Sequence, residues 1–447
     1  MSEYTNPIFN VFPEQVEDNS IEQFEYIRYN EINGLEVTNF TGPTLKIVTK
    51  DLHNYLWNRG GILDIVLRVT VNGAFTLGEN TTKMHDSILS VFRKASYFKN
   101  SVLVDEIEYP GMCTQVRNLL EYSDDYVTKQ GRLQGFHYES GDGAFDNTNF
   151  RVTQLSDGVN AKRLRVQIPL ARIFAYFNAY PAVEIGIEHR YEFVKETIIS
   201  NIVFGTNCDA ERVVFDECSI WIPKVVPSLD AQRQYLTALS SKSETLVSYE
   251  AWNGYRNSFN NPNGIPNLTW QISAISRKPK FVFVMLQYGP RLDEKDGAGA
   301  EFNPSLFDNA LVTNIELKVN SKRFPDDRYT IRFDASTAGQ ADDYIRPYLD
   351  FLRIMDKDTE YDNGSLVSYA DYKTKYPIFA FDLSREHSLY ENVQTNYISV
   401  EIIFNNSVLP IPPANPLFTK IYTNAIIVWD KELKVGGSQK ALELIRK

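Results

Sequence analysis

The stretch Ile62-Leu-Asp-Ile-Val-Leu-Arg-Val-Thr-Val71 decides the fold class. It is rich in β-branched and aliphatic side chains, and it ends at Asn72-Gly73, a pair typical of a two-residue β-hairpin turn. Similar runs with turn residues between them continue along the chain, and the next pair is Arg93–Phe98 and Val102–Ile107, which flank Lys99-Asn100-Ser101. This pattern predicts short antiparallel strands and an all-β protein.

Composition is that of a folded β protein. The 447 residues are 43% hydrophobic and include 27 Phe and 26 Tyr, ring types that suit half-buried pleated surfaces. The chain has no apolar run of the ~20 residues that a membrane span needs, and its first residues do not resemble a signal peptide. The net charge of −11 argues against a protein that grips nucleic acid over most of its surface. Three cysteines, an odd number, are too few for a disulfide framework and predict a reducing intracellular compartment: Cys113, Cys208 and Cys218.

Helices are predicted to be few and short. The stretch from Pro169 to Phe177 carries apolar residues at helical spacing, and Ser228 is placed to cap a helix that runs to about Leu239. Residues 182–194, by contrast, alternate as a strand does. Their acidic residues are predicted to share one outward face, which does not resemble the carboxylate pair of a glycoside hydrolase: Glu184, Glu188 and Glu192.

The second half of the chain repeats the landmarks of the first. Phe281–Leu286 corresponds to the strand that ends at Val71, the turn at Asn320-Ser321 lies 220 residues after Asn100, and Trp429 lies 208 residues after Trp221. Six such matches in the same order predict two copies of one β-fold. Each copy has about eight strand candidates, long loops and short helices, which favours a jelly-roll sandwich of two antiparallel sheets. We therefore predict two tandem eight-stranded jelly rolls.

The landmarks also divide the chain. The predicted parts are an N-terminal arm (1–24), a first jelly roll (25–226), a linker helix with a polar connection (227–266), a second jelly roll (267–432) and a basic C-terminal tail (433–447).

Several stretches resemble a family of viral capsid proteins. In the first half these are Asp86-Ser-Ile-Leu-Ser-Val-Phe92 and Phe98-Lys-Asn-Ser-Val-Leu103, and in the second half they are Asn314-Ile-Glu-Leu-Lys-Val-Asn-Ser321 and Tyr376-Pro-Ile-Phe-Ala-Phe-Asp-Leu383. The matches run in order from about residue 25 to about residue 432. The sequence resembles the double jelly-roll major capsid proteins of the Polinton/Maverick and adintovirus type.

This resemblance implies a structural protein of a double-stranded DNA virus or virus-like element. Members of the family are expected to form homotrimeric capsomers, in which six jelly rolls imitate a hexagon within an icosahedral shell. The implied location is the virion, and the implied partners are neighbouring capsomers, penton proteins and minor capsid proteins. Two alternatives stay open, because jelly rolls serve many functions. They are a carbohydrate-binding protein and a cellular protein domesticated from such an element.

The search for catalytic residues finds no motif. The chain lacks the P-loop, the zinc-protease and the nucleophile-elbow patterns, and it has no cysteine pair at zinc spacing. His189, beside Arg190 on the polar face of the predicted strand, is expected to be solvated or paired. We predict no enzymatic activity, no cofactor, and no catalytic, cofactor-binding or metal-binding residue. The five histidines are scattered along the chain: His53, His85, His137, His189 and His387.

The remaining hypotheses concern charged segments. The loops Asp356–Gly364 and Asp142–Asn149 carry oxygen ligands that suit Ca²⁺, although a solvated turn is the commoner structure of such loops. After Asp430 the chain has five basic and two acidic residues, and this tail either contacts packaged DNA or a minor protein or is a frayed terminus, the commoner case. Lys322-Arg323 and Asp326-Asp327-Arg328 are predicted to form surface ion pairs with one another near a hairpin.

Overall fold

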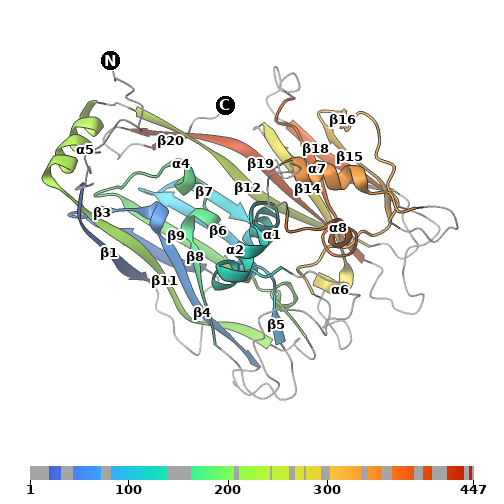
Figure 1. The fold of residues 1–447 in the computed structure, drawn as a ribbon, viewed down its shortest axis with the longest axis horizontal. Coiled ribbons are helices and arrows are strands. Elements are labelled where there is room, and N and C mark those ends of the chain that lie inside the picture. The colour runs from blue at the N-terminus through green and yellow to red at the C-terminus, as the bar shows by residue number, and fades with distance from the viewer. Residues whose placement is uncertain are drawn as a thin grey trace, which may run out of the picture.

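Strands dominate the computed structural model, which describes residues 20–31, 44–71, 82–138, 163–205, 211–241, 244–260, 267–275, 278–292, 303–333, 341–354, 365–386, 396–404, 420–436 and 442–444. They form two sandwiches side by side (Figure 1), so the all-β prediction is confirmed. We call the sandwich built from β1 to β11 roll 1 and the sandwich built from β12 to β19 roll 2.

Roll 1 has eight main strands in two antiparallel sheets. They are β1 (Ile21–Asn30), β2 (Thr44–Lys50), β4 (Ile62–Val71), β6 (Phe92–Lys99), β7 (Val102–Glu108), β8 (Leu164–Pro169), β9 (Glu188–Lys195) and β11 (Glu211–Pro227). The strand orders are β1-β11-β4-β8 and β2-β9-β6-β7. The short β3 (Tyr55–Leu56) also pairs with β11, and β5 (Thr82–Met84) pairs with β10 (Val203–Gly205).

Roll 2 is built in the same way. Its main strands are β12 (Glu244–Asn260), β13 (Asn267–Ile275), β14 (Pro279–Tyr288), β15 (Val312–Val319), β16 (Lys322–Phe324), β17 (Ile378–Asp382), β18 (Asn396–Phe404) and β19 (Lys420–Gly436). The orders are β12-β19-β14-β17 and β13-β18-β15-β16, and β20 (Leu442–Leu444) pairs with the end of β19. When the main strands of each roll are numbered one to eight, both rolls have the orders 1-8-3-6 and 2-7-4-5. The two halves are therefore two copies of one jelly roll, as the sequence predicts.

The same hairpin turn occurs in both rolls. Asn100 and Ser101, between β6 and β7, have φ of 47° and 69°, and Asn320 and Ser321, between β15 and β16, have φ of 51° and 72°. Two consecutive residues in the left-handed region match the twist of the flanking strands. Each Asn also binds the adjacent strand: the Asn100 side-chain oxygen accepts from the Glu188 amide at 3.1 Å, and that of Asn320 accepts from the Tyr397 amide at 3.0 Å.

The helices are short and lie in the connections. They are α1 (Pro110–Glu121), α2 (Asp124–Lys129), α3 (Leu170–Ile173), α4 (Tyr176–Ala179), α5 (Leu229–Ser241), α6 (Gly289–Leu292), α7 (Ile345–Arg353) and α8 (Tyr369–Thr374), with 3-10 turns η2 (Asn58–Gly60), η3 (Ile88–Val91), η4 (Gly131–Gln134) and η6 (Ile199–Asn201). Ser228 caps α5 as predicted, since its Oγ accepts from the Ala231 amide at 3.4 Å. The single helix predicted from Pro169 is instead the pair α3 and α4, because Phe174 between them is extended.

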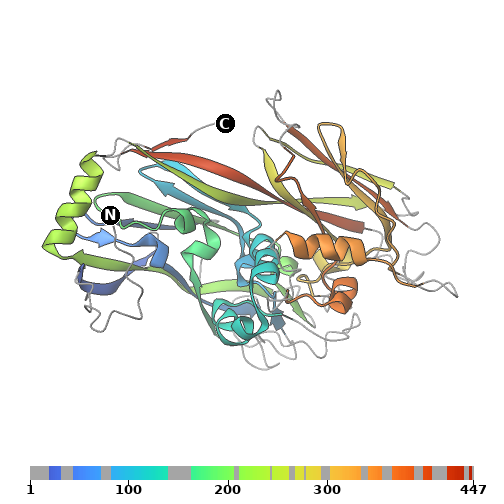
Figure 2. The ribbon, with the colours of Figure 1, turned by 45° about the horizontal axis from the view of Figure 1, so that its top comes forward.

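Residues 244–260 form β12, although the sequence analysis expects a polar connection there. Polar residues dominate this stretch, but Val247, Tyr249 and Ala251 alternate with them and are buried. They are covered by roll 1 rather than by the interior of their own sandwich. Figure 2 shows the paired strands β12 and β19 extending from roll 2 across roll 1.

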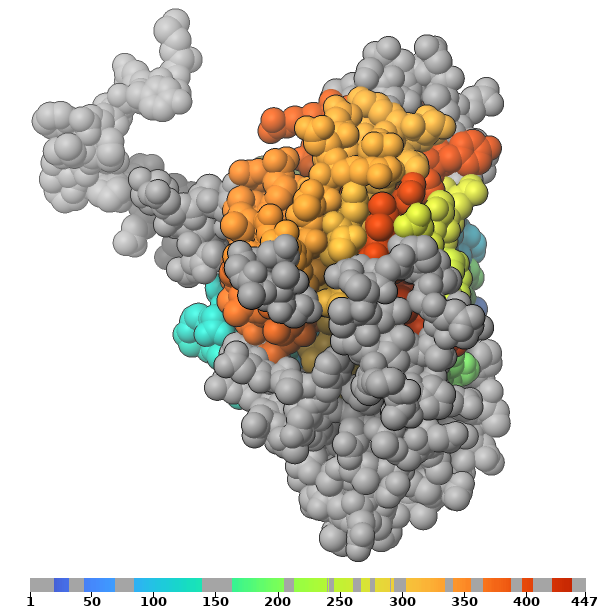
Figure 3. Space-filling model, turned by 90° about the vertical axis from the view of Figure 1, so that its right-hand side faces the viewer, coloured from blue at the N-terminus to red at the C-terminus, as the bar shows by residue number. Residues whose placement is uncertain are grey.

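The contact between the rolls is both apolar and polar. Gly254 lies so close to roll 1 that a Cβ built on it would be 2.8 Å from the Glu108 carbonyl oxygen. The Tyr249 hydroxyl donates to the Val104 carbonyl at 2.6 Å, and the buried Lys431 amine donates to the same oxygen. Figure 3 shows the molecule from the side of roll 2, whose described residues are coloured from yellow to red. Among the described residues no helix is long and apolar enough to cross a bilayer.

Candidate functional site

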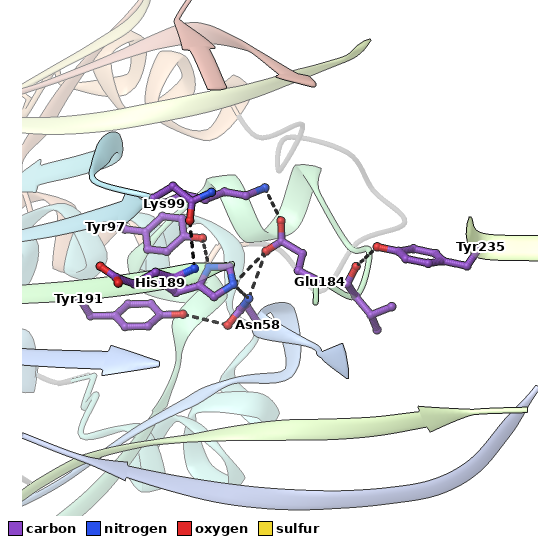
Figure 4. A network of polar contacts seen from close by, with 10 residues as sticks. Asn58, Tyr97, Lys99, Glu184, His189, Tyr191 and Tyr235 are labelled. Carbon is purple, nitrogen blue, oxygen red and sulfur yellow. Dashed lines mark hydrogen bonds and ion pairs between the residues drawn. The ribbon is translucent and has the colours of Figure 1, made fainter. Parts of the chain in front are cut away.

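A group of buried polar side chains surrounds His189 in roll 1, and Figure 4 shows it. We call it the polar cluster. Each of its residues is at most 2% exposed: Asn58, Tyr97, Lys99, Glu184, His189 and Tyr191.

Glu184 is the centre of the polar cluster. One carboxylate oxygen forms an ion pair with the Lys99 amine, and the other accepts from the Asn58 amide at 3.2 Å and lies 3.5 Å from His189 Nε2. On the other side of the imidazole, Nδ1 lies 2.8 Å from the Tyr97 hydroxyl. The Tyr191 hydroxyl donates to the Asn58 side-chain oxygen at 3.0 Å. Every member therefore has a polar partner inside the protein, as buried polar groups require.

Three parts of roll 1 that are distant in sequence meet at the polar cluster. Lys99 ends β6 directly before the hairpin turn, Asn58 begins η2, and His189 and Tyr191 belong to β9. Glu184 lies before β9 and forms an isolated antiparallel bridge with Leu56. The helix α5 is attached to the same segment, because the Tyr235 hydroxyl donates to the Val183 carbonyl at 2.6 Å.

The sequence analysis places Glu184 on an outward face, and this is wrong. Gly186, between Glu184 and β9, has φ of 69° in the left-handed region. The alternation of inward and outward residues therefore changes phase at Gly186, and Glu184 turns inward while Glu188 and Glu192 stay partly exposed. His189 is paired, as one of the predicted alternatives has it, but it is buried rather than surface-exposed.

Burial sets the protonation of the polar cluster. It lowers the pKa of His189 to about 4, and it raises the pKa values of Tyr97 and Tyr191 well above their ordinary value. The imidazole is therefore neutral at pH 7, with Nδ1 hydrogen-bonded to the Tyr97 hydroxyl and Nε2 3.2 Å from the Asn58 side-chain nitrogen. Because none of these side chains reaches solvent, the polar cluster cannot contact a dissolved substrate. Its hydrogen bonds and ion pair suit the joining of separate segments of roll 1 rather than catalysis.

The other predicted candidates are dispersed. His53 is exposed, His85 Nδ1 accepts from the Ser87 amide at 3.0 Å, and burial lowers the pKa of His137 to about 4. Cys113 and Cys218 are free and buried, as expected, and burial raises the pKa of Cys218 to about 12. A thiol of such high pKa is unreactive at neutral pH. Two candidates lie outside the described residues: His387 and Cys208.

No group of three or more His, Cys, Asp or Glu side chains in the described part of the chain could hold a metal ion. Both acidic loops, Asp356–Gly364 and Asp142–Asn149, lie outside it, so the calcium hypothesis stays a prediction. Most of the tail beyond Gly436 lies outside it as well, so the DNA contact also stays a prediction.

The predicted ion pairs around Lys322 have other partners than expected. Arg323 and Arg328 both bind Glu316, at 3.2 and 2.9 Å, and Lys322 binds Glu386 at 3.1 Å. Glu316 is only 1% exposed, so the two arginines bind a buried carboxylate on β15. The sequence shows the charges but not the distant carboxylates that bind them.

Comparison with known proteins decides the family. A family model described as a double jelly roll-like domain matches residues 138–427. The chain belongs to the double jelly roll-like family. This double jelly-roll chain also matches solved structures over nearly its whole length, although a search of curated protein sequences finds no match.

Two solved structures illustrate the similarity. A chain in a cryo-EM structure of the Sputnik virophage is 11% identical with a TM-score of 0.59, and the match covers 100% of this chain and 93% of that chain. The crystal structure of the mavirus major capsid protein is 10% identical with a TM-score of 0.51, covering 99% of this chain and 95% of that chain. At such low identity the likeness shows the double jelly-roll fold alone.

Within this double jelly-roll chain, the contacts that join the two rolls are the other candidate site. The Asp86 amide donates to Ser305 Oγ at 2.8 Å, and the Gln115 side chain donates to the Ser305 carbonyl at 2.7 Å. The Tyr138 hydroxyl donates to Asp371 at 2.8 Å. Ser305 is fully buried, so roll 1 binds a solvent-free part of roll 2. Sequence reasoning missed these contacts because each joins residues about 190 to 230 positions apart, and local periodicity carries no signal of such a pairing.

Proposed function

We propose that this chain is the major capsid protein of a double-stranded DNA virus or virus-like element. In this proposal three copies form a capsomer of pseudo-hexagonal outline within an icosahedral shell. The observation that carries it is the repeated strand order, 1-8-3-6 and 2-7-4-5, in both rolls. The similarity of fold to the mavirus major capsid protein supports the same role.

The duplicated fold has a physical consequence for assembly. Two similar domains in one chain allow three identical chains to present six similar units, so a three-fold object can fill a six-fold position. The contacts of such a ring are heterologous, with roll 2 of one chain against roll 1 of the next, and they close after three chains. A rigid connection between the rolls serves this role, and the buried contacts around Ser305 and Tyr249 supply it.

A non-enzymatic role accounts for where the polar groups lie. The polar cluster around Glu184 is closed to solvent, and the described residues contain no metal-binding group. The expected partners are further capsomers, penton proteins and minor capsid proteins, with contact between the tail and packaged DNA as a weaker hypothesis. The expected location is the virion, and the division into an arm, two rolls, a linker and a tail is part of the proposal.

Size and shape of the purified full-length chain test the proposal. Mass photometry is expected to give a particle of three times 51.3 kDa, and negative-stain microscopy is expected to show a hexagonal outline. A stable monomer that binds sugar in a glycan array would contradict the capsid role and favour a carbohydrate-binding protein.

A further inference from the structure

The contact between the rolls joins two sheet edges. Strand β7 is the last strand of one sheet in roll 1, and β12 is the outermost strand of a sheet in roll 2. Side chains of β12 bind the backbone of β7: the Tyr249 hydroxyl donates to the Val104 carbonyl at 2.6 Å, and the Asn253 side-chain oxygen accepts from the Glu108 amide at 2.8 Å. This contact therefore places the first strand of one roll against the fifth strand of the other.

Beside this contact roll 1 has little empty space. The corner between β7, α1 and α3 contains a cavity of only about 10 Å³, and Trp252 of β12 is one of its lining residues. Trp252 is 6% exposed. The first strand of roll 2 thus covers the β7 side of roll 1.

The equivalent corner of roll 2 is open. It lies between β16, α7 and β17, which follow one another in roll 2 as β7, α1 and β8 do in roll 1. Here the structure has a groove of about 360 Å³, which we call the β16 groove. Six of its lining residues define it: Lys322, Phe324, Tyr329, Arg346, Asp350 and Phe381. Residues of roll 2 coloured orange, the colour of this part of the chain, reach the surface in Figure 3.

Roll 1 has an uncovered counterpart of β12. Within the described residues β1 pairs with β11 alone, so its other edge is free, and exposed edges of this kind are where further strands and chains bind. Phe24 and Tyr26 are 47% and 45% exposed, which is unusual for large aromatic side chains on a strand. Figure 1 shows β1 on the side of roll 1 that is remote from roll 2.

The two first strands can be aligned through their pairing partners. Arg28 is opposite Trp221, and Ala251 is opposite Trp429, the tryptophan that occupies the same place in roll 2. Counting along the strands from these pairs places Tyr26 at the position of Tyr249, Phe24 at that of Val247 and Asn30 at that of Asn253. Val247 and Tyr249 are 4% and 5% exposed because roll 1 covers them. Their counterparts on β1 are exposed, and no strand among the described residues takes that place.

We propose that β1 of one copy binds the edge of β16 and the β16 groove of the next copy, repeating between chains the contact that β12 makes with β7 within the chain. This inference rests on the proposed trimer and names its contact surfaces. In this contact the Tyr26 hydroxyl donates to a backbone carbonyl of the segment Lys322–Tyr329, as the Tyr249 hydroxyl donates to Val104 within the chain. The segment Lys322–Tyr329 corresponds to Val104 and its neighbours. The occupant is a second copy of this chain.

A photo-crosslinker tests this placement. The full-length chain carrying benzoylphenylalanine in place of Tyr26 is assembled, irradiated, digested and analysed by mass spectrometry. The expected product is a crosslink between two chains that ends within Lys322–Tyr329. The matched control carries the same group in place of Leu133, which is 67% exposed on η4, and is expected to give no crosslink between the chains of one capsomer.

The outcomes separate the two proposals. A wild-type trimer with a crosslink from position 26 to another part of the partner chain would overturn the β1 placement and leave the capsid proposal standing. A wild-type chain that stays monomeric at micromolar concentration would overturn both. A trimer with the expected crosslink supports both.

Substitution gives a second measurement. Y26D is expected to raise the dissociation constant of the trimer at least tenfold, because it removes the aromatic ring and the hydroxyl donor that anchor the proposed contact. The variant still folds, since residue 26 is exposed in the monomer, and far-UV circular dichroism checks this. L133D changes another exposed residue, 67% exposed on η4, and is expected to leave the trimer intact. Equal trimer stability for Y26D and wild type would overturn the inference.

Discussion

Lys99 has no contact with solvent, and its amine is held by Glu184, which is also buried. Removing two charges from water costs free energy that their attraction and hydrogen bonds must offset, so a buried pair adds little stability compared with apolar residues of similar volume. Loss of one partner is different, because it leaves the other charge buried and unpaired. The pair therefore acts mainly to hold the end of β6 against the segment before β9.

K99M is expected to lower the free energy of unfolding by about 3–5 kcal/mol, because Glu184 loses its cation in a solvent-free site. Urea unfolding followed by tryptophan fluorescence measures this change. K129M is the matched control, since Lys129 and Asp125 are 69% and 71% exposed, and it is expected to change stability by less than about 0.5 kcal/mol. The double change of Lys99→Met with Glu184→Leu should recover much of the loss; no recovery would contradict the assigned pairing.

His189 makes stability depend on pH. Burial lowers its pKa to about 4, so between the ordinary value of 6.5 and about 4 the unfolded chain binds a proton that the folded chain does not. The stabilisation is complete above pH 6.5 and is lost as the pH falls towards 4, with a slope of about 1.4 kcal/mol per pH unit. His137, which is partly buried and has a similar pKa, adds a second contribution of the same sign.

H189Q is expected to reduce the slope of unfolding free energy against pH by about 1.4 kcal/mol per unit near pH 5, because glutamine does not titrate. Urea unfolding at half-unit steps from pH 4 to 7 measures the slope. H53Q is the control, because it replaces an exposed histidine outside the polar cluster. A slope in H189Q equal to that of wild type would show that His189 takes up its proton in the folded state.

Among the elements, the two hairpin turns show how a local rule produces the repeat. Both use Asn-Ser, and Ser101 and Ser321 have φ of 69° and 72°, a region in which a side chain costs free energy and glycine does not. S101G and S321G are each expected to raise the free energy of unfolding by roughly 0.5–1 kcal/mol. Differential scanning calorimetry measures the shift in melting temperature.

S101V and S321V are each expected to lower the free energy of unfolding, because β-branched side chains avoid positive φ. If S101G and S101V had the same stability, the left-handed conformation of the turn would be refuted in solution.

These turns also explain how much of the fold could be read from sequence. Turn residues and capping residues such as Ser228 act within a few positions, so their effect is visible in the chain itself. Strand β12 was missed because its apolar residues are covered by roll 1, and a long-range contact leaves no local pattern. Strand β19 runs to Gly436 and so includes the first residues of the segment predicted as the C-terminal tail, 433–447.

The site was less predictable than the fold. Strand alternation correctly predicts partly exposed positions for Glu188 and Glu192, but a single residue with positive φ, Gly186, reverses the phase and buries Glu184. Any glycine can adopt such a conformation, and nothing in the sequence around Gly186 shows that it does. The partners of Ser305 and Tyr249 lie in the other roll, so only the folded chain brings them together.

At the scale of the whole molecule, the close approach at Gly254 joins the two rolls. A Cβ there would lie 2.8 Å from both the Glu108 carbonyl oxygen and the Met112 side chain, and a backbone atom cannot move aside as a side chain can. G254A is expected to destabilise the protein by about 1–3 kcal/mol through overpacking. Thermal unfolding measures the loss, and limited proteolysis should detect looser contact between the rolls.

G131A is the control for this change. A Cβ on Gly131 would meet its nearest neighbours at 3.6 Å, an ordinary van der Waals distance. We expect its melting temperature to stay within a few degrees of wild type. If G254A had the same melting temperature as G131A, the two rolls would be able to move apart at Gly254 without loss of stability.

The long pairing of β12 with β19 also orders events during synthesis. Every residue of β12 pairs with a residue of β19, whose last residue is Gly436, so β12 acquires its full neighbour only after residue 436 has been synthesised. Val104 leaves the ribosome long before the end of β19, since translation at ~5–20 residues per second separates Val104 from Gly436 by roughly 15–70 seconds. During that interval the newborn roll 1 presents the surface that roll 2 later occupies. A neighbouring nascent chain on the same messenger RNA could bind that surface with its own β12. Domain swapping between chains is therefore most favoured during this interval.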